Sequence, residues 1–249
     1  MIKVLMLAGS GEARRLAALI ASDQDVTAIA SLAGATRYPT PLPLETRVGG
    51  FGGRAAQERY ILREGFDLVV DATHPFAARI SERTSSICHD NSIPYLHLRR
   101  AAWEPQEGDD WIMLNTPEEA KDHIPNGATV FLATGRGTLA SFANLAGRHL
   151  ICRQIDPPEQ PFPFENGEYL IGKPPFSVEH EMDLFTDRKV DVLIVKNAGG
   201  APSRTKLDAA RRLGIKVLMI KRPPLPKGDH VSTVDAAMDW IIQHKVRTV

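Results

Sequence analysis

VLMLAGSGEARRLA, from Val4 to Ala17, is echoed later in the chain by VFLATGRGTLASF, from Val130 to Phe142. Each stretch is an apolar run, a turn with two glycines one residue apart, and then apolar residues at helical spacing. This order predicts a buried strand, a tight turn and a helix whose first N–H groups point out of the turn. Glycine suits such a turn because it tolerates positive φ and lets an anion approach the backbone. The repetition predicts two related domains with a ligand held between them.

The composition is that of an ordinary globular protein. The 249 residues suffice for one large domain or two modest ones, and 43% are hydrophobic. Thirty basic residues balance thirty acidic ones, so global charge does not favour nucleic acid as a partner. No apolar run approaches the ~20 residues that span a bilayer, and the apolar start is expected to be a first strand rather than a signal peptide. Cys88 and Cys152 have no CxxC spacing, which predicts reduced thiols and a cytoplasmic protein.

Strands and helices alternate along the chain, which predicts an α/β fold of two Rossmann-like domains, each a parallel sheet flanked by helices. Strands are expected near 2–8, 25–31, 44–48, 67–71, 94–98, 111–114, 128–133, 149–154, 191–195 and 216–220. Helices are expected near 11–21, 53–64, 76–91, 116–124, 137–146, 177–188, 202–213 and 232–245. A polar stretch after residue 98 serves as the linker, so we expect domains over 1–100 and 101–249 with the active site in the cleft between them. The Pro-rich segment from residue 155 predicts a rim loop or lid, or equally a plain solvated excursion.

The first glycine turn is a partial match to the dinucleotide-binding motif. That motif has a third glycine three positions after the second, where this chain has an arginine. The strand before the turn and the helix after it favour phosphate binding over a purely structural turn. The expected cofactor contacts here are Gly9, Ser10, Gly11, Glu12 and Arg14.

The end of the second strand bears on the choice of nicotinamide cofactor. Folds that prefer NAD place a carboxylate there for the ribose 2′-hydroxyl. This chain has Ser31, Thr36 and Arg37 instead, which suit a 2′-phosphate and favour NADPH, although Arg37 could equally be an exposed loop charge. Gly50 and Gly52 belong to a Gly-rich turn after the third strand, which predicts either a close approach to the cofactor or a flexible loop tip.

The fourth strand ends in the sequence DATHPFA, from Asp71 to Ala77. The carboxyl ends of parallel strands are where open α/β sheets hold their ligands, so Thr73 is an expected cofactor contact. His74 is the candidate catalytic residue, because its imidazole can donate a proton near neutral pH. The competing interpretation is that His74 only caps the helix that starts near Pro75.

Basic and small residues gather at the expected strand ends of the second half, where Lys206 also lies. Together they would form a basic wall suited to carboxylates or phosphates, although any single one of them is more often a solvated surface charge. The expected substrate contacts are Arg136, Arg153, Lys173, Lys196, Asn197, Gly199, Gly200 and Arg222.

Several chemistries are absent from the sequence. It contains no GxSxG elbow, no P-loop and no metal-ligand spacing, so a bound cofactor is expected to supply the reactivity. A sugar- or nucleotide-modifying enzyme, such as an epimerase or glycosyltransferase-like protein, is an alternative. A short-chain dehydrogenase or epimerase needs a Tyr-x-x-x-Lys pair on one face of a helix. That spacing occurs at Tyr169 and Lys173, but Gly172 and Pro174 predict that this segment is not helical, so the match is expected to be a coincidence. A non-catalytic nucleotide sensor is a third hypothesis, which leaves the basic wall unexplained.

An ordered series of motifs resembles the precorrin-6A reductase family of cobalamin biosynthesis and its cobalt-precorrin counterparts. The motifs are GSGEAR from Gly9, DATHPFA from Asp71, RAAWEPQEGD from Arg100, LATGR from Leu132, PFS from Pro175, KNAGG from Lys196 and IKRP from Ile220. Departures are Ser10, where Gly or Thr is common, and Ala198, where Ser is common. The resemblance implies NADPH-dependent reduction of the C18–C19 double bond of a polycarboxylated tetrapyrrole, giving precorrin-6B. It also implies cobalamin-pathway enzymes as candidate neighbours.

Overall fold

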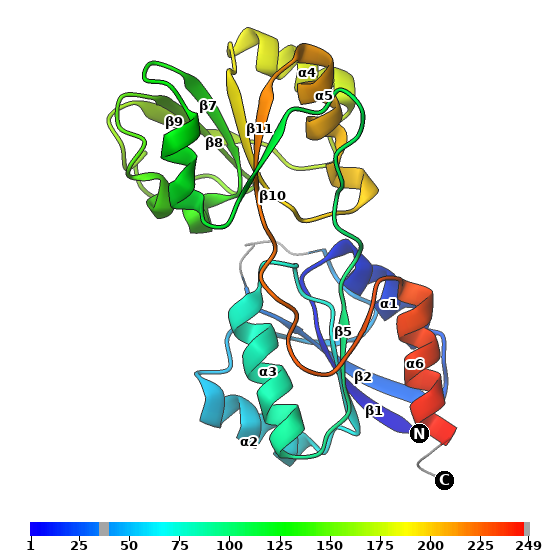
Figure 1. Cartoon of the computed structure of the whole chain (residues 1–249). Coiled ribbons are helices and arrows are strands. Elements are labelled where there is room, and N and C mark those ends of the chain that lie inside the picture. The colour runs from blue at the N-terminus through cyan, green and yellow to red at the C-terminus, as the bar shows by residue number, and fades with distance from the viewer. Residues whose placement is uncertain (35–39, 247–249) are drawn as a thin grey trace. The chain divides into compact units, whose positions relative to one another are not determined.

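The structure is a computed structural model that describes residues 1–34 and 40–246, and its chain forms two compact units (Figure 1). The first unit contains Met1–Ala101 together with the chain from Pro223 onward, and the second contains Ala102–Arg222. The expected second domain, 101–249, was therefore too long at its C-terminal end. The last stretch returns to the first unit because its strand pairs with the first sheet and its helix packs into the first core.

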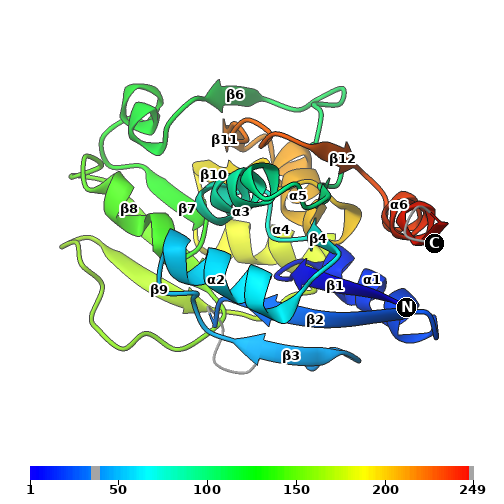
Figure 2. The same ribbon diagram turned by 90° about the horizontal axis from the view of Figure 1, so that it is seen from below.

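The first unit is built on a six-stranded parallel sheet of order β12-β5-β4-β1-β2-β3. Figure 2 shows β1, β2 and β3 side by side along one edge. Read from β3, this is the strand order 3-2-1-4-5-6 that is common among dinucleotide-binding sheets, with the sixth strand supplied by the C-terminal stretch. The strands are β1 (Ile2–Leu7), β2 (Val26–Leu32), β3 (Glu45–Val48), β4 (Leu68–Asp71), β5 (Tyr95–Leu98) and β12 (Asp229–Val231).

Two helices cover each face of this sheet. Successive side chains of a strand point to opposite faces, so Val4 and Met6 pack against α1 (Gly11–Ala21) and α6 (Val234–Val246). Leu5 and Leu7 pack against α2 (Arg54–Glu64) and α3 (Ala78–Asp90). The expected core face of the first helix is confirmed, since its buried residues are Ala13, Leu16, Ala17 and Ile20.

The second unit repeats the same strand order on a second parallel sheet, β6-β11-β10-β7-β8-β9. Here β7 takes the central place that β1 has in the first unit, and β6, from the N-terminal side, is the sixth strand. The strands are β6 (Trp111–Leu114), β7 (Thr129–Ala133), β8 (His149–Gln154), β9 (Gly167–Ile171), β10 (Val192–Lys196) and β11 (Lys216–Ile220). The α-helices are α4 (Val178–Asp187) and α5 (Thr205–Leu213).

The sequence-based predictions were wrong at several elements. The helices expected near 116–124 and 137–146 are the 3₁₀ helices η1 (Pro117–His123) and η2 (Arg136–Phe142), and a third, η3 (Ala201–Ser203), precedes α5. Strands β9 and β12 were missed, because β9 is only half-buried and β12 is three residues long. The capping residues predicted at two helix ends were confirmed. Ser177 accepts a hydrogen bond from the His180 N–H, and Gly214 ends α5 at φ +66°.

Cys88 and Cys152 are both buried free thiols. Burial raises the pKa of Cys88 to about 12 and that of Cys152 to about 11, so both are protonated and inert near neutral pH. Among the residues that the structure describes, no helix has the length and apolar character to cross a lipid bilayer.

The place of α6 in the first core predicts a large difference between two adjacent isoleucines. Ile241 is fully buried in that core, whereas Ile242 is 41% exposed. We expect Ile241→Ala to lower the free energy of unfolding by about 2–5 kcal/mol through the cavity it leaves, and Ile242→Ala by less than about 0.5 kcal/mol. Urea unfolding measures both variants, and amide hydrogen exchange locates the loss. Unchanged protection of β1 and α1 in Ile241→Ala would contradict the assignment of α6 to the first unit.

Candidate functional site

The first unit has a topological switch point between β1 and β4, because the chain leaves these neighbouring strands toward opposite edges of the sheet. The Ser10 hydroxyl joins the two turns there, donating to the Ala72 carbonyl at 2.7 Å and accepting from the Ala13 N–H at 3.1 Å. Gly9 has φ +151°, and a Cβ on it would lie 3.9 Å from the backbone nitrogen of His74. The first glycine turn thus lies directly against the end of β4.

The first turn of α1 carries an ion pair that the sequence did not predict. The Arg100 guanidinium donates to Glu12 Oε2 at 2.6 Å, with both side chains mostly shielded from solvent. Burial acts to raise the pKa of Glu12, but the hydrogen bond and the positive charge of Arg100 outweigh it, and the pKa lies below its usual range. Glu12 is therefore a carboxylate fixed at the helix start, while Arg14 in the same turn is exposed.

Beside the end of β2 lies an arginine of β3 that was not predicted from the sequence. Ser31 and Arg47 are register partners on β2 and β3, and Arg47 Nη1 donates to the Ser31 hydroxyl at 2.6 Å. The guanidinium lies 4.0 Å from the centroid of the Phe51 ring, and Nη2 donates to the Gly50 carbonyl at 3.2 Å. Arg47 stands two residues before the Gly-rich turn, and that spacing is the signal that could have identified it.

Two other predicted residues for this position, Thr36 and Arg37, lie outside the described residues. Gly52 has φ +79° and starts the approach to α2, so its conformation favours glycine.

The end of β4 is fixed by buried hydrogen bonds. Asp71 accepts from the Thr73 N–H at 3.0 Å and from the Tyr95 hydroxyl at 2.9 Å. Burial raises the pKa of Tyr95, with the Asp71 charge adding to the effect, so the phenol stays protonated as a donor. Thr73 turns its hydroxyl toward Ser81 at 3.3 Å. These contacts set the direction in which His74 leaves the strand.

His74 has the capping contact that was one of the two interpretations of its sequence position. Its Nδ1 accepts from the Phe76 N–H at 3.2 Å, which is the turn-capping arrangement before α3. The neutral imidazole therefore carries its proton on Nε2. Capping through Nδ1 leaves Nε2 as the atom that could donate a proton.

These residues fit the pyrophosphate of a dinucleotide. A helix start supplies N–H groups without intrahelical acceptors, and Gly11 at the first position of α1 has no side chain to cover them. Apart from its chain neighbours and the helix backbone, the described atom within 4 Å of a Cβ built on Gly11 is Arg14 Nη2, at 3.9 Å, the end of a flexible side chain. An anion can therefore approach this backbone closely.

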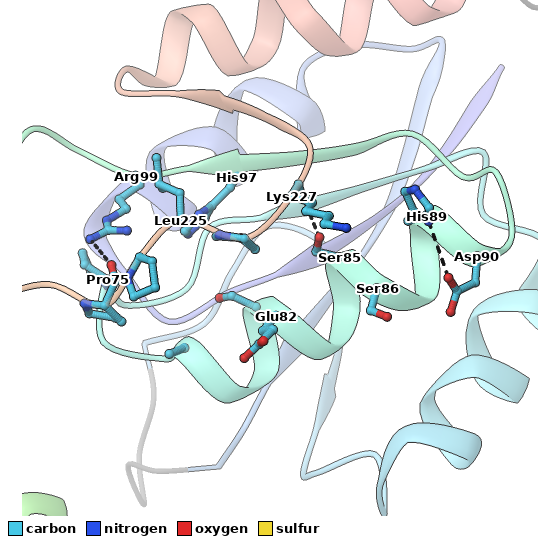
Figure 3. Close-up of a pocket in the computed structure, with 15 residues that line it drawn as sticks. Pro75, Glu82, Ser85, Ser86, His89, Asp90, His97, Arg99, Leu225 and Lys227 are labelled. Atoms are coloured by element: carbon cyan, nitrogen blue, oxygen red, sulfur yellow. Dashed lines mark hydrogen bonds and ion pairs between the residues drawn. The ribbon is translucent and has the colours of Figure 1, made fainter.

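A separate cavity of the first unit lies between α3 and the segment Pro223–Lys227 (Figure 3). It has a volume of about 480 Å³, and Arg99 borders it while donating to the Pro223 carbonyl at 2.9 Å. His97 lines it from β5 and is 4% exposed. Burial lowers the pKa of His97, so the ring is neutral near pH 7.

The second unit has its own switch point, between β7 and β10. Arg136 begins η2 directly after Gly135 and is exposed. At the end of β10, Lys196 is half-buried, and burial lowers its pKa. Gly199 and Gly200 follow with φ +70° and +85°, the left-handed conformation for which glycine is favoured.

Asn197 has a structural contact that the sequence did not predict. Its Oδ1 accepts from the Trp103 N–H at 2.8 Å and its Nδ2 donates to the Trp103 carbonyl at 2.9 Å. The Trp103 indole N–H also donates to the Gly200 carbonyl at 2.9 Å, and Arg222 Nε donates to the Asn197 carbonyl at 2.6 Å. The segment around Trp103 is therefore held against the end of β10.

A cavity of about 170 Å³ opens at the carboxyl ends of β7 and β8. Arg153 and Lys206 line it, so the structure brings these two of the basic residues together. Lys173 is exposed in the loop after β9. Tyr169 lies within strand β9, which confirms that the Tyr-x-x-x-Lys spacing is not helical. The Pro-rich segment before β9 packs back on that strand, with the Phe162 and Tyr169 ring centroids 4.9 Å apart.

Comparison with known proteins gives consistent matches over nearly the whole chain. The family model described as Precorrin-6x reductase CbiJ/CobK matches residues 3–242. A precorrin-6A reductase of Rhodococcus erythropolis is 41% identical over 244 residues, covering 97% of this chain and 98% of the relative. A cobalt-precorrin-6A reductase of Priestia megaterium is 27% identical over 251 residues, covering 96% and 98%. A solved structure described as CobK precorrin-6A reductase matches with a TM-score of 0.92 at 39% identity, covering 98% of this chain and 97% of that chain.

Proposed function

The chain belongs to the precorrin-6x reductase family, CbiJ/CobK, and we propose that it reduces precorrin-6A to precorrin-6B in cobalamin biosynthesis, with NADPH as the reductant. The double bond reduced is C18–C19 of the macrocycle. The observation that carries the proposal is the Gly-Ser-Gly turn at the β1–β4 switch point, in a chain 41% identical to a precorrin-6A reductase over nearly its full length. This geometry is typical of dinucleotide binding.

Identity to the relatives also bears on the form of the substrate. The relative named precorrin-6A reductase is 41% identical and the one named cobalt-precorrin-6A reductase is 27% identical, at similar coverage. This difference favours the metal-free macrocycle as the substrate, with the cobalt form as the second candidate.

We assign the 2′-phosphate of NADPH to Arg47. The arginine extends from the end of β3 toward Ser31, where dinucleotide folds recognise the adenosine ribose, and no carboxylate is hydrogen-bonded to it in the described chain. Its stacking on Phe51 holds the guanidinium in a fixed plane, which suits bidentate contact with a phosphate. The other cofactor contacts in this proposal are Gly9, Ser10, Gly11, Glu12, Arg14, Ser31, Gly50, Gly52 and Thr73, with Thr36 and Arg37 proposed from the sequence alone.

The second unit is proposed to bind the carboxylate arms of the macrocycle. Charge-assisted hydrogen bonds from arginine and lysine are the strong contacts available for carboxylates. The proposed contacts are Arg136, Lys173, Lys196, Asn197, Gly199, Gly200 and Arg222, together with Arg153, whose guanidinium is paired with Glu181 and contributes as part of the binding surface.

NADPH supplies a hydride when it is bound. The tasks left to the chain are to orient the two ligands and to deliver a proton. A conjugated, electron-poor macrocycle accepts hydride readily, so positioning accounts for most of the catalysis we propose. His74 is the proposed proton donor, through Nε2, because its Nδ1 is already engaged by the Phe76 N–H.

The proposed activity is tested by NADPH oxidation with precorrin-6A and cobalt-precorrin-6A assayed side by side. We expect oxidation with the metal-free substrate and a lower kcat/KM with the cobalt form. Absence of turnover with both substrates, in protein that binds NADPH, would overturn the proposed reaction.

The assignment of Arg47 predicts selectivity between the two nicotinamide cofactors. NADPH is expected to bind more tightly than NADH to the wild-type protein, and Arg47→Ala is expected to weaken NADPH binding by about 10–100-fold while changing NADH binding little, because a charge-assisted contact contributes about 1.5–3 kcal/mol. Fluorescence titration measures both constants. Arg63→Ala is the matched control, since both Arg47 and Arg63 lie over the Tyr60 ring but Arg63 pairs with Glu64. Equal losses for NADPH and NADH in Arg47→Ala would refute the 2′-phosphate assignment.

The proton-donor role of His74 can be separated from its turn-capping role. Asparagine before a proline keeps an acceptor for the Phe76 N–H but cannot transfer a proton at neutral pH. We therefore expect His74→Asn to fold normally and to lower kcat by about 10²–10⁴-fold, with loss of one ionisation from the pH–rate profile. Steady-state kinetics across pH measure this effect. Wild-type turnover in His74→Asn at every pH would leave the residue with the capping role only.

A further inference from the structure

The cavity at the carboxyl ends of β7 and β8 has an unusual combination of charges. It is lined by Arg153 from β8, Glu181 from α4 and Lys206 from α5, together with Phe176 and Gln154. Its volume of about 170 Å³ is below the roughly 300–1,000 Å³ of pockets that enclose a whole drug-sized ligand. The cavity is therefore large enough for one arm of a ligand but not for a macrocycle.

Arg153 is neutralised and fixed within this cavity. Its Nη1 and Nη2 donate to the two carboxylate oxygens of Glu181 at 2.7 and 2.8 Å, and the two side chains are 8% and 0% exposed. The guanidinium also lies 4.4 Å from the Phe176 ring centroid and 5.0 Å from that of Phe131. A bidentate pair whose guanidinium also contacts two aromatic rings is a rigid wall with no net charge.

Lys206 adds a positive charge that this pair does not cancel. Its ammonium donates to the Ser203 carbonyl and lies 5.5 Å from the centroid of the Trp103 ring. Within residues 1–34 and 40–246, no carboxylate lies at ion-pair distance from it. The three charged groups that line the cavity therefore sum to one positive charge when Lys206 is protonated.

The surroundings of Lys206 change the pKa of its ammonium group. Burial lowers its pKa to about 8, the positive charge of Arg153 adds to this effect, and the negative charge of Glu181 opposes it. An anion beside the ammonium would favour the charged form and restore the pKa.

We propose that this cavity is a subsite for a single carboxylate arm of the ligand, in which the Lys206 ammonium holds the carboxylate and the Arg153–Glu181 pair forms the supporting wall. The identity of the arm, an acetate or propionate of a tetrapyrrole, rests on the proposed function, whereas carboxylate binding at Lys206 does not. The sequence places Lys206 among the other basic residues of the second half and indicates no specific role for it. The structure gives it one, because it is the uncompensated charge of this cavity.

The Trp103 indole provides a probe that is independent of catalysis. Succinate is titrated into the ¹⁵N-labelled full chain while the indole N–H resonance of Trp103, assigned with Trp103→Phe, is followed. We expect a saturable shift, at least tenfold weaker binding in Lys206→Met, and recovery in Lys206→Arg. Lys216→Met is the matched control, because Lys216 starts β11 at the opposite end of the sheet and is expected to bind as the wild type does. Succinamide, which has the shape of succinate without its charge, is expected not to bind.

The pH dependence follows from the pKa of Lys206. Below about pH 8 the ammonium is charged and binds the carboxylate, and the affinity for succinate is expected to fall as pH rises through 8 to 9. Wild-type affinity in Lys206→Met, equal binding of succinamide, or a shift that never saturates would each overturn the subsite. An enzyme that binds succinate as expected but fails to oxidise NADPH with precorrin-6A would overturn the proposed function and leave the subsite standing. In an active enzyme, we expect Lys206→Met to raise KM more than it lowers kcat.

Discussion

The parallel pairing of one central strand with neighbours on both sides is the constraint on which the rest of each unit depends. In the first sheet β1 pairs with β2 and β4, and in the second β7 pairs with β8 and β10. The connections from such a central strand and from its neighbour leave toward opposite edges, so two turns are forced to lie together at the carboxyl ends of the strands. The hydrogen bond from Ser10 to the Ala72 carbonyl fixes this meeting in the first unit. The strand order therefore determines where a ligand can meet the chain, whatever side chains the turns carry.

Much of the fold could be predicted from the sequence because local patterns encode it. Apolar strands, the helical face of Ala13, Leu16 and Ile20, and the caps at Ser177 and Gly214 all depend on neighbours within a few residues. The elements that were predicted wrongly depend on contacts between residues far apart in the sequence. β12 exists as a strand because it pairs with β5, and three residues with no buried side chain carry no periodicity of their own. The boundary at Pro223 was missed for the same reason.

The candidate site shows the same division between local and distant signals. The glycine turn and the DATHPFA segment were visible because their residues are adjacent in the sequence. Arg47 was overlooked because the evidence for its role is its hydrogen bond to Ser31, and the two residues become neighbours only through the register of β2 and β3. Glu12 and Arg100 are 88 residues apart and form an ion pair that no spacing rule indicates. Asn197 bridges the backbone of Trp103 in the same way, across 94 residues.

The two sheets share one strand order but differ in how their basic residues are compensated. Arg47 is held by neutral partners, the Ser31 hydroxyl, the Gly50 carbonyl and the Phe51 ring, so its charge remains available to a dianion. Arg153 is compensated by Glu181, which leaves Lys206 as the uncompensated charge of its cavity. A buried lysine can lose its proton, whereas an arginine cannot, so the second arrangement makes binding sensitive to pH near neutrality and the first does not. In the arrangement that we propose, one topology thus provides a permanently charged site for phosphate and a titratable site for carboxylate.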